Sequence, residues 1–265
     1  MRYAPAVFLT VFALFSGPAT AVSPEDEALR ISRAAIGARI PDLTFQNIDK
    51  EPVKLSDFEG KPLVISLVYT ACADVCPAVI DNLYPAIEAA QSALGKDSFS
   101  VVTVGFDVSQ DSPERMRSFA RTRGIDLPNW HFLSGDNASV SKLIKVVGFT
   151  IVPSAGGFDH MAQVSMVDAD GTVYQQIYGG TFSAPALVEP LKDLVYDRKQ
   201  PLASVAGIIE RVKLFCTVYN PNTGRYYFNY SLFMGIAIGL ACLLLVLGWL
   251  IREFRRSDGP GTGHA

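Results

Sequence analysis

The sequence carries no excess of positive charge. Its 265 residues have a formal net charge of −3 at pH 7, with 23 lysines and arginines against 26 aspartates and glutamates. Proteins that bind nucleic acid need a basic surface to meet the phosphates, so this composition excludes nucleic acid as a partner. The chain also has no internal repeat and no low-complexity stretch. Its length leaves room for one well-packed domain with extra segments but not for two large domains.

Hydrophobic residues make up 49% of the chain, and the excess lies at the two ends. The N-terminus has a single arginine, then an apolar run over residues 4–15, and then an Ala-Thr-Ala tripeptide that ends at Ala21. A short basic start, an apolar stretch too short to span a bilayer and an Ala-x-Ala ending are typical of a secretory signal. We therefore predict a signal peptide over residues 1–21, followed by a polar, helix-prone leader over residues 22–38.

Near the C-terminus, the 20 residues from Leu232 to Ile251 contain no charged side chain. At a rise of about 1.5 Å per residue, such a helix covers the roughly 30 Å hydrocarbon core of a bilayer. Three arginines follow within residues 252–256, and the positive-inside rule places them in the cytoplasm. We therefore expect a transmembrane helix over residues 232–251 in the inner (cytoplasmic) membrane, a cytoplasmic tail over residues 252–265, and the main domain in the periplasm.

Strand and helix patterns alternate over residues 39–196, as in an α/β domain. Two extended segments around a turn at residues 47–50 predict an N-terminal β-hairpin. The runs at 63–69 and 100–106 are nearly all apolar, which indicates strands covered on both faces. Further elements are expected as a helix from about 77, a helix opening at 112–114, a strand at 130–133, a helix at 138–147, strands at 163–167 and 173–178, and a helix at 183–196. The order β-β-β-α-β-α-β-α-β-β-α predicts a thioredoxin-like fold, joined to the membrane by a linker over residues 197–231.

Two cysteines, Cys72 and Cys76, follow the first buried strand, where a helix is expected to begin. Because a helix N-terminus stabilises anions, both thiols should have lowered pKa values and thiolate character. Three residues separate them, whereas thioredoxin-type redox pairs have two. Residues four apart on a regular helix have Cβ atoms about 5–6 Å apart, but a disulfide needs about 3.5–4.5 Å. The spacing therefore favours a shared metal ion without excluding a disulfide.

Two thiolates are too few for a structural zinc site, but one imidazole would complete a three-coordinate soft site that suits Cu(I). The chain has only three histidines. His264 lies in the predicted cytoplasmic tail, and His131 is interpreted as a histidine on a sheet face. His160 follows a glycine-rich stretch and precedes a predicted strand, which places it on a loop at the end of the sheet. His160 is therefore the predicted third ligand, with Asp159 either orienting its ring or forming part of a surface turn.

Several motifs together resemble the Sco (SenC) family. They are Thr70-x-Cys72-x-Asp74-x-Cys76-Pro77, Gly105-Phe106-Asp107, Asp111-Ser112-Pro113-Glu114, Trp130-His131-Phe132-Leu133-Ser134-Gly135 and Asp159-His160. The resemblance covers most of the predicted exported domain. It implies a thioredoxin-fold copper chaperone that helps to assemble the binuclear copper centre of cytochrome c oxidase. It also implies that Cys72, Cys76 and His160 bind copper. A second state, in which Cys72 and Cys76 are oxidised to a disulfide, is implied as well.

Two features depart from the family pattern. Ala73 stands where a proline commonly follows the first cysteine, which bears on the redox poise of the pair. The predicted anchor is C-terminal, where many relatives carry it at the N-terminus, which bears on the orientation toward a partner. Neither departure removes a predicted ligand.

Three functions compete on these observations. The first is a copper chaperone without enzymatic turnover, whose partners would be a copper-receiving oxidase subunit and an envelope thiol reductant. The second is a thiol–disulfide oxidoreductase acting on cysteines of a copper protein, which would need Cys72 and Cys76 but not His160. The third is a peroxiredoxin-like peroxidase, which is disfavoured because Ala73 stands where a threonine usually precedes a peroxidatic cysteine. The presence of His160 favours the copper chaperone.

The other two cysteines are interpreted as structural. Cys242 lies inside the predicted membrane span, where it serves as an apolar side chain. Cys216 is on the predicted exported side, and we interpret it as a packed cysteine, with a second metal or partner contact as the alternative.

Overall fold

The computed structural model describes residues 23–72, 75–154, 157–179, 183–197, 217–220, 225–228 and 230–257. In the helix that begins at residue 75, it describes side chains from Ala78 onward. The predicted signal peptide therefore lies outside the described residues, as do Cys216 and His264.

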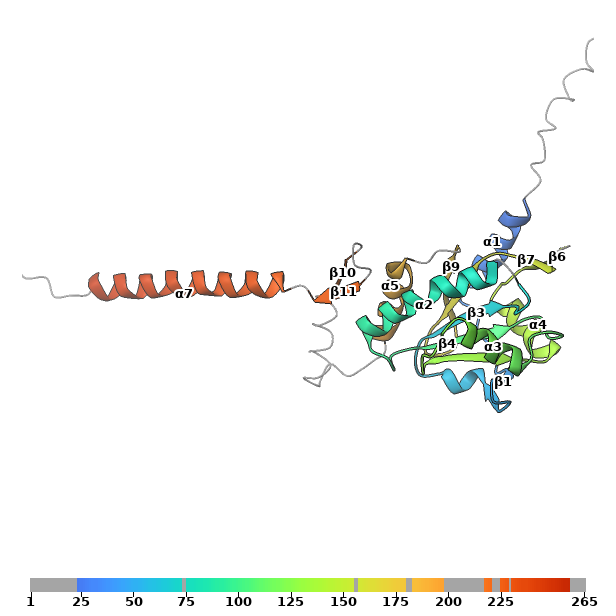
Figure 1. Cartoon of the computed structure of the whole chain (residues 1–265). Coiled ribbons are helices and arrows are strands. Elements are labelled where there is room, and N and C mark those ends of the chain that lie inside the picture. Colours follow the sequence, from blue (N-terminus) through green and yellow to red (C-terminus); the bar gives the residue numbers. More distant parts are fainter. Residues whose placement is uncertain are drawn as a thin grey trace, which may run out of the picture.

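Strands and helices follow one another in the predicted order, with two hairpins, β6–β7 and β10–β11, that the sequence pattern does not predict (Figure 1). The elements are α1 (Pro24–Ala34), β1 (Thr44–Asn47), β2 (Pro52–Lys54), a 3₁₀ turn η1 (Leu55–Phe58), β3 (Leu63–Val68), α2 (Val75–Leu94), β4 (Ser100–Gly105), α3 (Pro113–Thr122), β5 (Trp130–Ser134), α4 (Asn137–Val146), β6 (Ile151–Ser154), β7 (Gly157–His160), β8 (Gln163–Val167), β9 (Val173–Tyr178), α5 (Ala184–Asp197), β10 (Thr217–Asn220), β11 (Arg225–Phe228) and α7 (Ser231–Ser257).

The main sheet has the strand order β2-β1-β5-β4-β3-β8-β9. Strand β4 runs parallel to both β3 and β5, and the pairs β3–β8, β8–β9, β1–β2 and β1–β5 are antiparallel. Both parallel connections step in the same direction along the sheet, so right-handed crossovers place α2 and α3 on one face. Tyr84 of α2 and Phe119 of α3 indeed both contact aromatic rings of β5. The predicted thioredoxin-like α/β fold with an N-terminal β-hairpin is confirmed.

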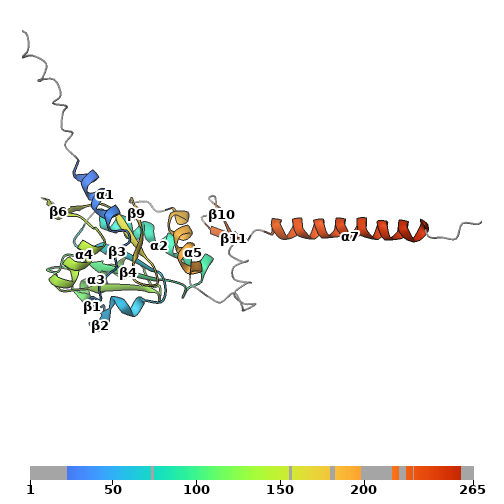
Figure 2. The same ribbon diagram turned by 180° about the vertical axis from the view of Figure 1, so that it is seen from behind.

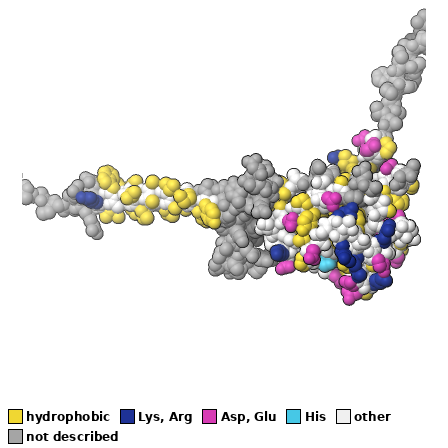
Figure 3. Space-filling view, in the orientation of Figure 1, with side chains coloured by type: hydrophobic (Ala, Val, Ile, Leu, Met, Phe, Trp, Pro, Cys, Tyr) yellow, Lys and Arg dark blue, Asp and Glu magenta, His cyan; other side chains and the backbone are white. Residues whose placement is uncertain are grey.

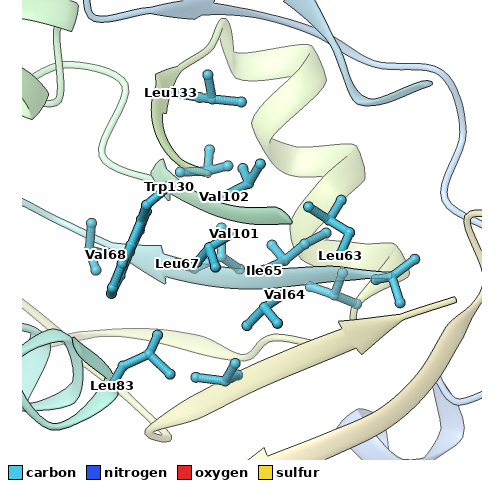
Figure 4. Packing of buried hydrophobic residues seen from close by; sticks show 14 of the residues in the cluster. Leu63, Val64, Ile65, Leu67, Val68, Leu83, Val101, Val102, Trp130 and Leu133 are labelled. Atoms are coloured by element: carbon cyan, nitrogen blue, oxygen red, sulfur yellow. The ribbon is translucent and has the colours of Figure 1, made fainter. Parts of the chain in front are cut away.

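The core is centred on β3 and β4, in each of which all six residues are buried (Figure 4). Strands with one solvated face alternate apolar and polar residues, whereas these two are mostly apolar along their whole length because both faces are covered. Leu83 of α2 and Leu133 of β5 pack into the same cluster. This rigid centre carries the segment after β3, where Cys72 lies.

Both edges of the sheet are short or partly covered. Strand β2 has three residues and begins with Pro52, which has no N–H to offer. At the other edge, residues 37–40 run beside the start of β9. Here the N–H of Gly37 donates to the carbonyl of Val173 at 2.8 Å, and the N–H of Val173 donates to the carbonyl of Ala38 at 2.9 Å.

The C-terminal part of the chain contains a long apolar helix, α7. Within it, Phe233–Arg252 has a mean hydropathy of 2.6, and none of these residues is buried. Hydrophobic side chains are spread along its visible surface, with backbone and other atoms between them (Figure 3). A helix of this length and composition can cross a membrane, and its bounds lie within a residue of the predicted span. Strand β11 contacts α2, and Figure 2 shows β10, β11 and α7 at one end of the domain with α1 and β6 at the other.

Candidate metal centre

The first cysteine lies in a tight turn after β3. The N–H of Cys72 donates to the carbonyl of Tyr69 at 3.1 Å, and the Cys72 side chain is half-buried against the core. Helix α2 begins at Val75, two residues earlier than predicted, so Cys76 is its second residue. Cys72 thus precedes the helix, and the spacing expected on a regular helix does not apply to this pair. Both cysteines still lie at the positive end of the α2 dipole, which favours thiolates.

His160 ends strand β7, so it lies on a hairpin strand and not on the predicted loop. Its imidazole is half-buried among aromatic rings, at centroid distances of 5.3 Å from Phe149, 5.7 Å from Phe106 and 6.3 Å from Tyr69. Nδ1 lies 3.2 Å from the carbonyl oxygen of Met161. When Nδ1–H donates to this carbonyl, Nε2 carries the lone pair that a metal ligand needs.

Burial lowers the pKa of the His160 imidazole, opposed by the Met161 carbonyl and by the charge of Asp159. The ring is therefore neutral at neutral pH, which is the form that binds metals. Asp159 itself is exposed and precedes His160 on the strand, so its side chain points to the opposite face of the hairpin. The polar partner of Nδ1 that the structure shows is thus a backbone carbonyl.

Tyr69 connects the histidine to the cysteine turn. It stands three residues before Cys72, and its ring contacts both His160 and, at 5.4 Å, Phe158. Gly157 has φ +125°, and a Cβ built there would lie 2.8 Å from the Tyr69 hydroxyl oxygen. Only glycine can therefore let the β6–β7 hairpin approach so closely. This close packing holds the hairpin over the end of β3.

Asp111 anchors the same turn from the other side. The backbone N–H and the hydroxyl of Thr70 both donate to Oδ1 of Asp111 at 2.7 Å, and the N–H of Asp107 donates to Oδ2 at 2.8 Å. The side chain is buried, and burial raises its pKa while these donors lower it. Gly105 makes room, because a Cβ there would lie 2.4 Å from the Asp111 Cβ.

We compared the sequence with known protein families. The SCO1/SenC family profile matches residues 37–196, which is more than half of the chain. The chain belongs to the SCO1/SenC family. The predicted resemblance is thereby confirmed, and the match includes the cysteine turn and the histidine hairpin.

Solved structures share the fold of this SCO1/SenC member. Bradyrhizobium japonicum ScoI with copper bound is 24% identical, with 59% of this chain and 99% of that chain covered and a TM-score of 0.50. A SCO1/SenC family lipoprotein from Bacillus anthracis is 23% identical, with 60% and 95% covered and a TM-score of 0.54. BsSco, described with a disulfide switch and as a member of the Sco family of cytochrome c oxidase assembly proteins, is 19% identical, with 60% and 94% covered and a TM-score of 0.52.

The remaining predicted residues do not join this centre within the described part of the chain. His131 lies on β5 as expected, with its ring 5.0 Å from that of Phe58, and burial together with the charge of Lys61 lowers its pKa. Cys242 is exposed on α7. Among the described side chains, no group of three or more histidine, cysteine, aspartate or glutamate residues is placed to bind one metal ion. The side chain of Cys76 is not one of those described.

Two residues that shape the site, Asp111 and Tyr69, take their roles only in the folded protein. Asp111 belongs to a family motif, but its contact depends on Thr70, which is 41 residues away in the sequence. Tyr69 reads as the last residue of an apolar strand, and only the folded hairpin shows its contact with His160. Asp111 follows β4, the strand beside β3, and an acidic residue in the loop after a neighbouring buried strand is the one signal in the sequence that points toward this anchor.

Proposed function

We propose that this SCO1/SenC protein binds one copper ion through Cys72, Cys76 and His160 and delivers it to, or prepares, the binuclear copper centre of cytochrome c oxidase. The observation that carries the proposal is the packing of the His160 hairpin on Tyr69, three residues before Cys72. This contact draws a neutral imidazole and the first cysteine, which are far apart in the sequence, into one neighbourhood. Copper-bound ScoI and the oxidase-assembly description of BsSco support the proposal from the family side.

The chemistry of these side chains suits Cu(I). Thiolate and imidazole are the soft donors that select this ion, and the α2 N-terminus favours the thiolate form. The aromatic rings around His160 shield one side of the site from water, which limits exchange of the ligands with solvent. Copper is here a cargo, so the residues bind and orient it without turnover.

Copper(I) titration of the reduced full-length protein in detergent, in competition with a chromophoric chelator, tests the proposal. We expect one tightly bound copper per chain. His131→Ala is the matched control, since His131 lies on β5 away from the cysteine turn, and it should bind copper as the parent does. Absence of copper uptake by a protein whose thiols are verified as reduced would overturn the proposal.

A second function, thiol–disulfide exchange on cysteines of a copper protein, is favoured by one observation. Cys72 lies three residues before the start of α2, near the helix N-terminus, where the helix dipole favours a reactive thiolate. BsSco is described with a disulfide switch. This function would need an envelope thiol reductant as partner, and it would not need His160.

We further propose that α7 anchors the protein in the inner membrane, with the domain over residues 39–196 in the periplasm, after removal of residues 1–21, and the tail over residues 252–265 in the cytoplasm. The apolar length of α7 and the arginines that follow support this orientation.

Reporter fusions test the orientation. A reporter that is active only in the cytoplasm should work when fused after Ala265 and fail when fused near Gln200, because the positive-inside rule keeps the arginines in the cytoplasm. A reporter that needs export should give the opposite result at each site. Cytoplasmic activity at Gln200 would contradict the orientation and the oxidising environment that it implies for the cysteines.

A further inference from the structure

Helix α1 lies outside the residues that the family profile matches, because the match begins at residue 37. The helix is nevertheless firmly formed. The Ser23 hydroxyl accepts the N–H of Asp26 at 3.1 Å as an N-cap, and Ala28 and Ser32 form a buried face. This face docks on the two ends of the segment that carries His160.

At the entry to that segment, α1 packs directly on Gly148. This glycine ends α4 with φ +64°. A Cβ built on it would lie 2.7 Å from the carbonyl oxygen of Ile31 and 2.8 Å from the Cα of Ser32, which is closer than side chains allow. The residue that follows is Phe149, whose ring contacts the His160 imidazole. Helix α1 thus contacts the backbone at Gly148, one residue before Phe149, whose ring packs on the His160 imidazole.

At the exit from the segment, α1 is hydrogen-bonded to the end of β9. The Tyr178 hydroxyl donates to the Ser32 hydroxyl oxygen at 3.0 Å. Tyr178 pairs with Gln163 in the β8–β9 ladder, and Gln163 stands three residues after His160. Ser32 is fully buried, and Tyr178 is partly exposed, so the bond as a whole is partly buried.

The two ends of the 148–162 segment are also joined to each other by hydrogen bonds. The side-chain amides of Gln163 and Gln176 both donate to the carbonyl of Val147, at 2.9 and 3.0 Å. Residues 148–162 therefore start from the end of α4 and return to the start of β8 at the same point, with His160 near the return. Helix α1 contacts Gly148 on one side of this base and, on the other side, Tyr178, the ladder partner of Gln163.

We propose that Ser32 is a positioning residue for the His160 imidazole, and that α1 acts as a brace on the base of the 148–162 segment. The inference rests on the proposed copper site. A ligand on a projecting hairpin must be ordered when the metal binds, and a rigid base removes part of that entropic cost beforehand. Cys72 and Cys76 are carried by β3 and α2, which these α1 contacts do not include. The brace therefore acts on the imidazole arm of the site and not on the thiols.

Two variants of the full-length protein test the brace. Ser32→Leu puts a larger side chain into a fully buried position and should displace α1. We expect it to weaken copper(I) binding about 10-fold, at the lower end of what loss of an outer partner costs. Tyr178→Phe removes only the hydroxyl that bonds Ser32, and should weaken copper binding about 2- to 10-fold. Hydrogen exchange of residues 149–162 should become faster in both variants.

Controls separate the brace from a general loss of folding and from failure of the copper site. Arg33→Ala on the exposed face of α1 and Tyr174→Phe at an exposed position of β9 should change neither copper affinity nor exchange. The midpoint of Cys72–Cys76 oxidation should stay unchanged in Ser32→Leu and Tyr178→Phe. If Ser32→Leu does not fold, Tyr178→Phe decides the question.

The His160→Ala background completes the test. There, Ser32→Leu should cost no further copper affinity, because the arm on which α1 acts has been removed. If His160→Ala weakens copper binding but the Ser32 and Tyr178 variants leave affinity and exchange unchanged, the brace is wrong and the proposed function stands. If His160→Ala itself binds copper as the parent does, the proposed site fails and the brace fails with it.

Discussion

Cys72→Ala and Cys76→Ala are each expected to abolish both copper binding and the internal disulfide, whereas His160→Ala should strongly weaken copper binding and leave the disulfide intact. Loss of one ligand from a three-coordinate site should exceed the roughly 10–100-fold that loss of an outer partner costs. The thiols supply both properties, and the imidazole supplies only one. The measurements are copper(I) competition and redox titration of the thiols, on the same full-length preparations.

The same variants distinguish the two proposed functions in cells. When copper is scarce, His160→Ala should fail to support cytochrome c oxidase assembly at normal protein levels, and the matched His131→Ala should support it. If His160→Ala supports assembly as well as the parent while either cysteine variant fails, the protein works through thiol exchange, and copper delivery is the wrong function.

Asp111→Ala should lower the free energy of unfolding by about 2–4 kcal/mol, since unsatisfied donors in a partly buried site cost about 1–3 kcal/mol each. The change removes the acceptor of three hydrogen bonds, two of them from Thr70. The measurement is chemical denaturation of the apo protein. Because Thr70 stands two residues before Cys72, copper affinity should fall as well.

Asp107→Ala is the matched control for this variant. Within the part of the chain that the structure describes, its carboxylate accepts from Ser109 alone, at 2.6 Å from the hydroxyl and 3.2 Å from the N–H, in an exposed turn. Its cost should stay near 1 kcal/mol or below, as for a surface turn or cap. Equal costs for Asp107→Ala and Asp111→Ala would show that Asp111 does not anchor the cysteine turn.

The central sheet could be predicted because its signal is local. Every residue of β3 and β4 is apolar or small, and a run of this kind has few alternatives to a strand covered on both faces. The end of α4 could be predicted as well, because helices commonly end at a glycine that adopts positive φ, as Gly148 does. Cys72 and His160 were predicted as site residues, and the structure draws their segments together through Tyr69.

What could not be predicted depends on contacts between distant residues. The β6–β7 hairpin contains Pro153 and Gly157, which argue against strands when taken alone. It forms because Phe158 and His160 pack on Tyr69 and Phe106, far away in the sequence. Likewise, the polar leader gives no sign that α1 docks, because its buried face consists of small residues.

The covered edges of the sheet bear on how the protein behaves at high concentration. An open strand edge is a template for pairing with a second copy, and two-dimensional confinement in a membrane would raise the frequency of such encounters. Strand β2 offers only three residues and a proline, and residues 37–40 occupy the start of β9. If α7 anchors the protein as proposed, neighbouring copies in one membrane would find only these short stretches of open edge with which to join their sheets.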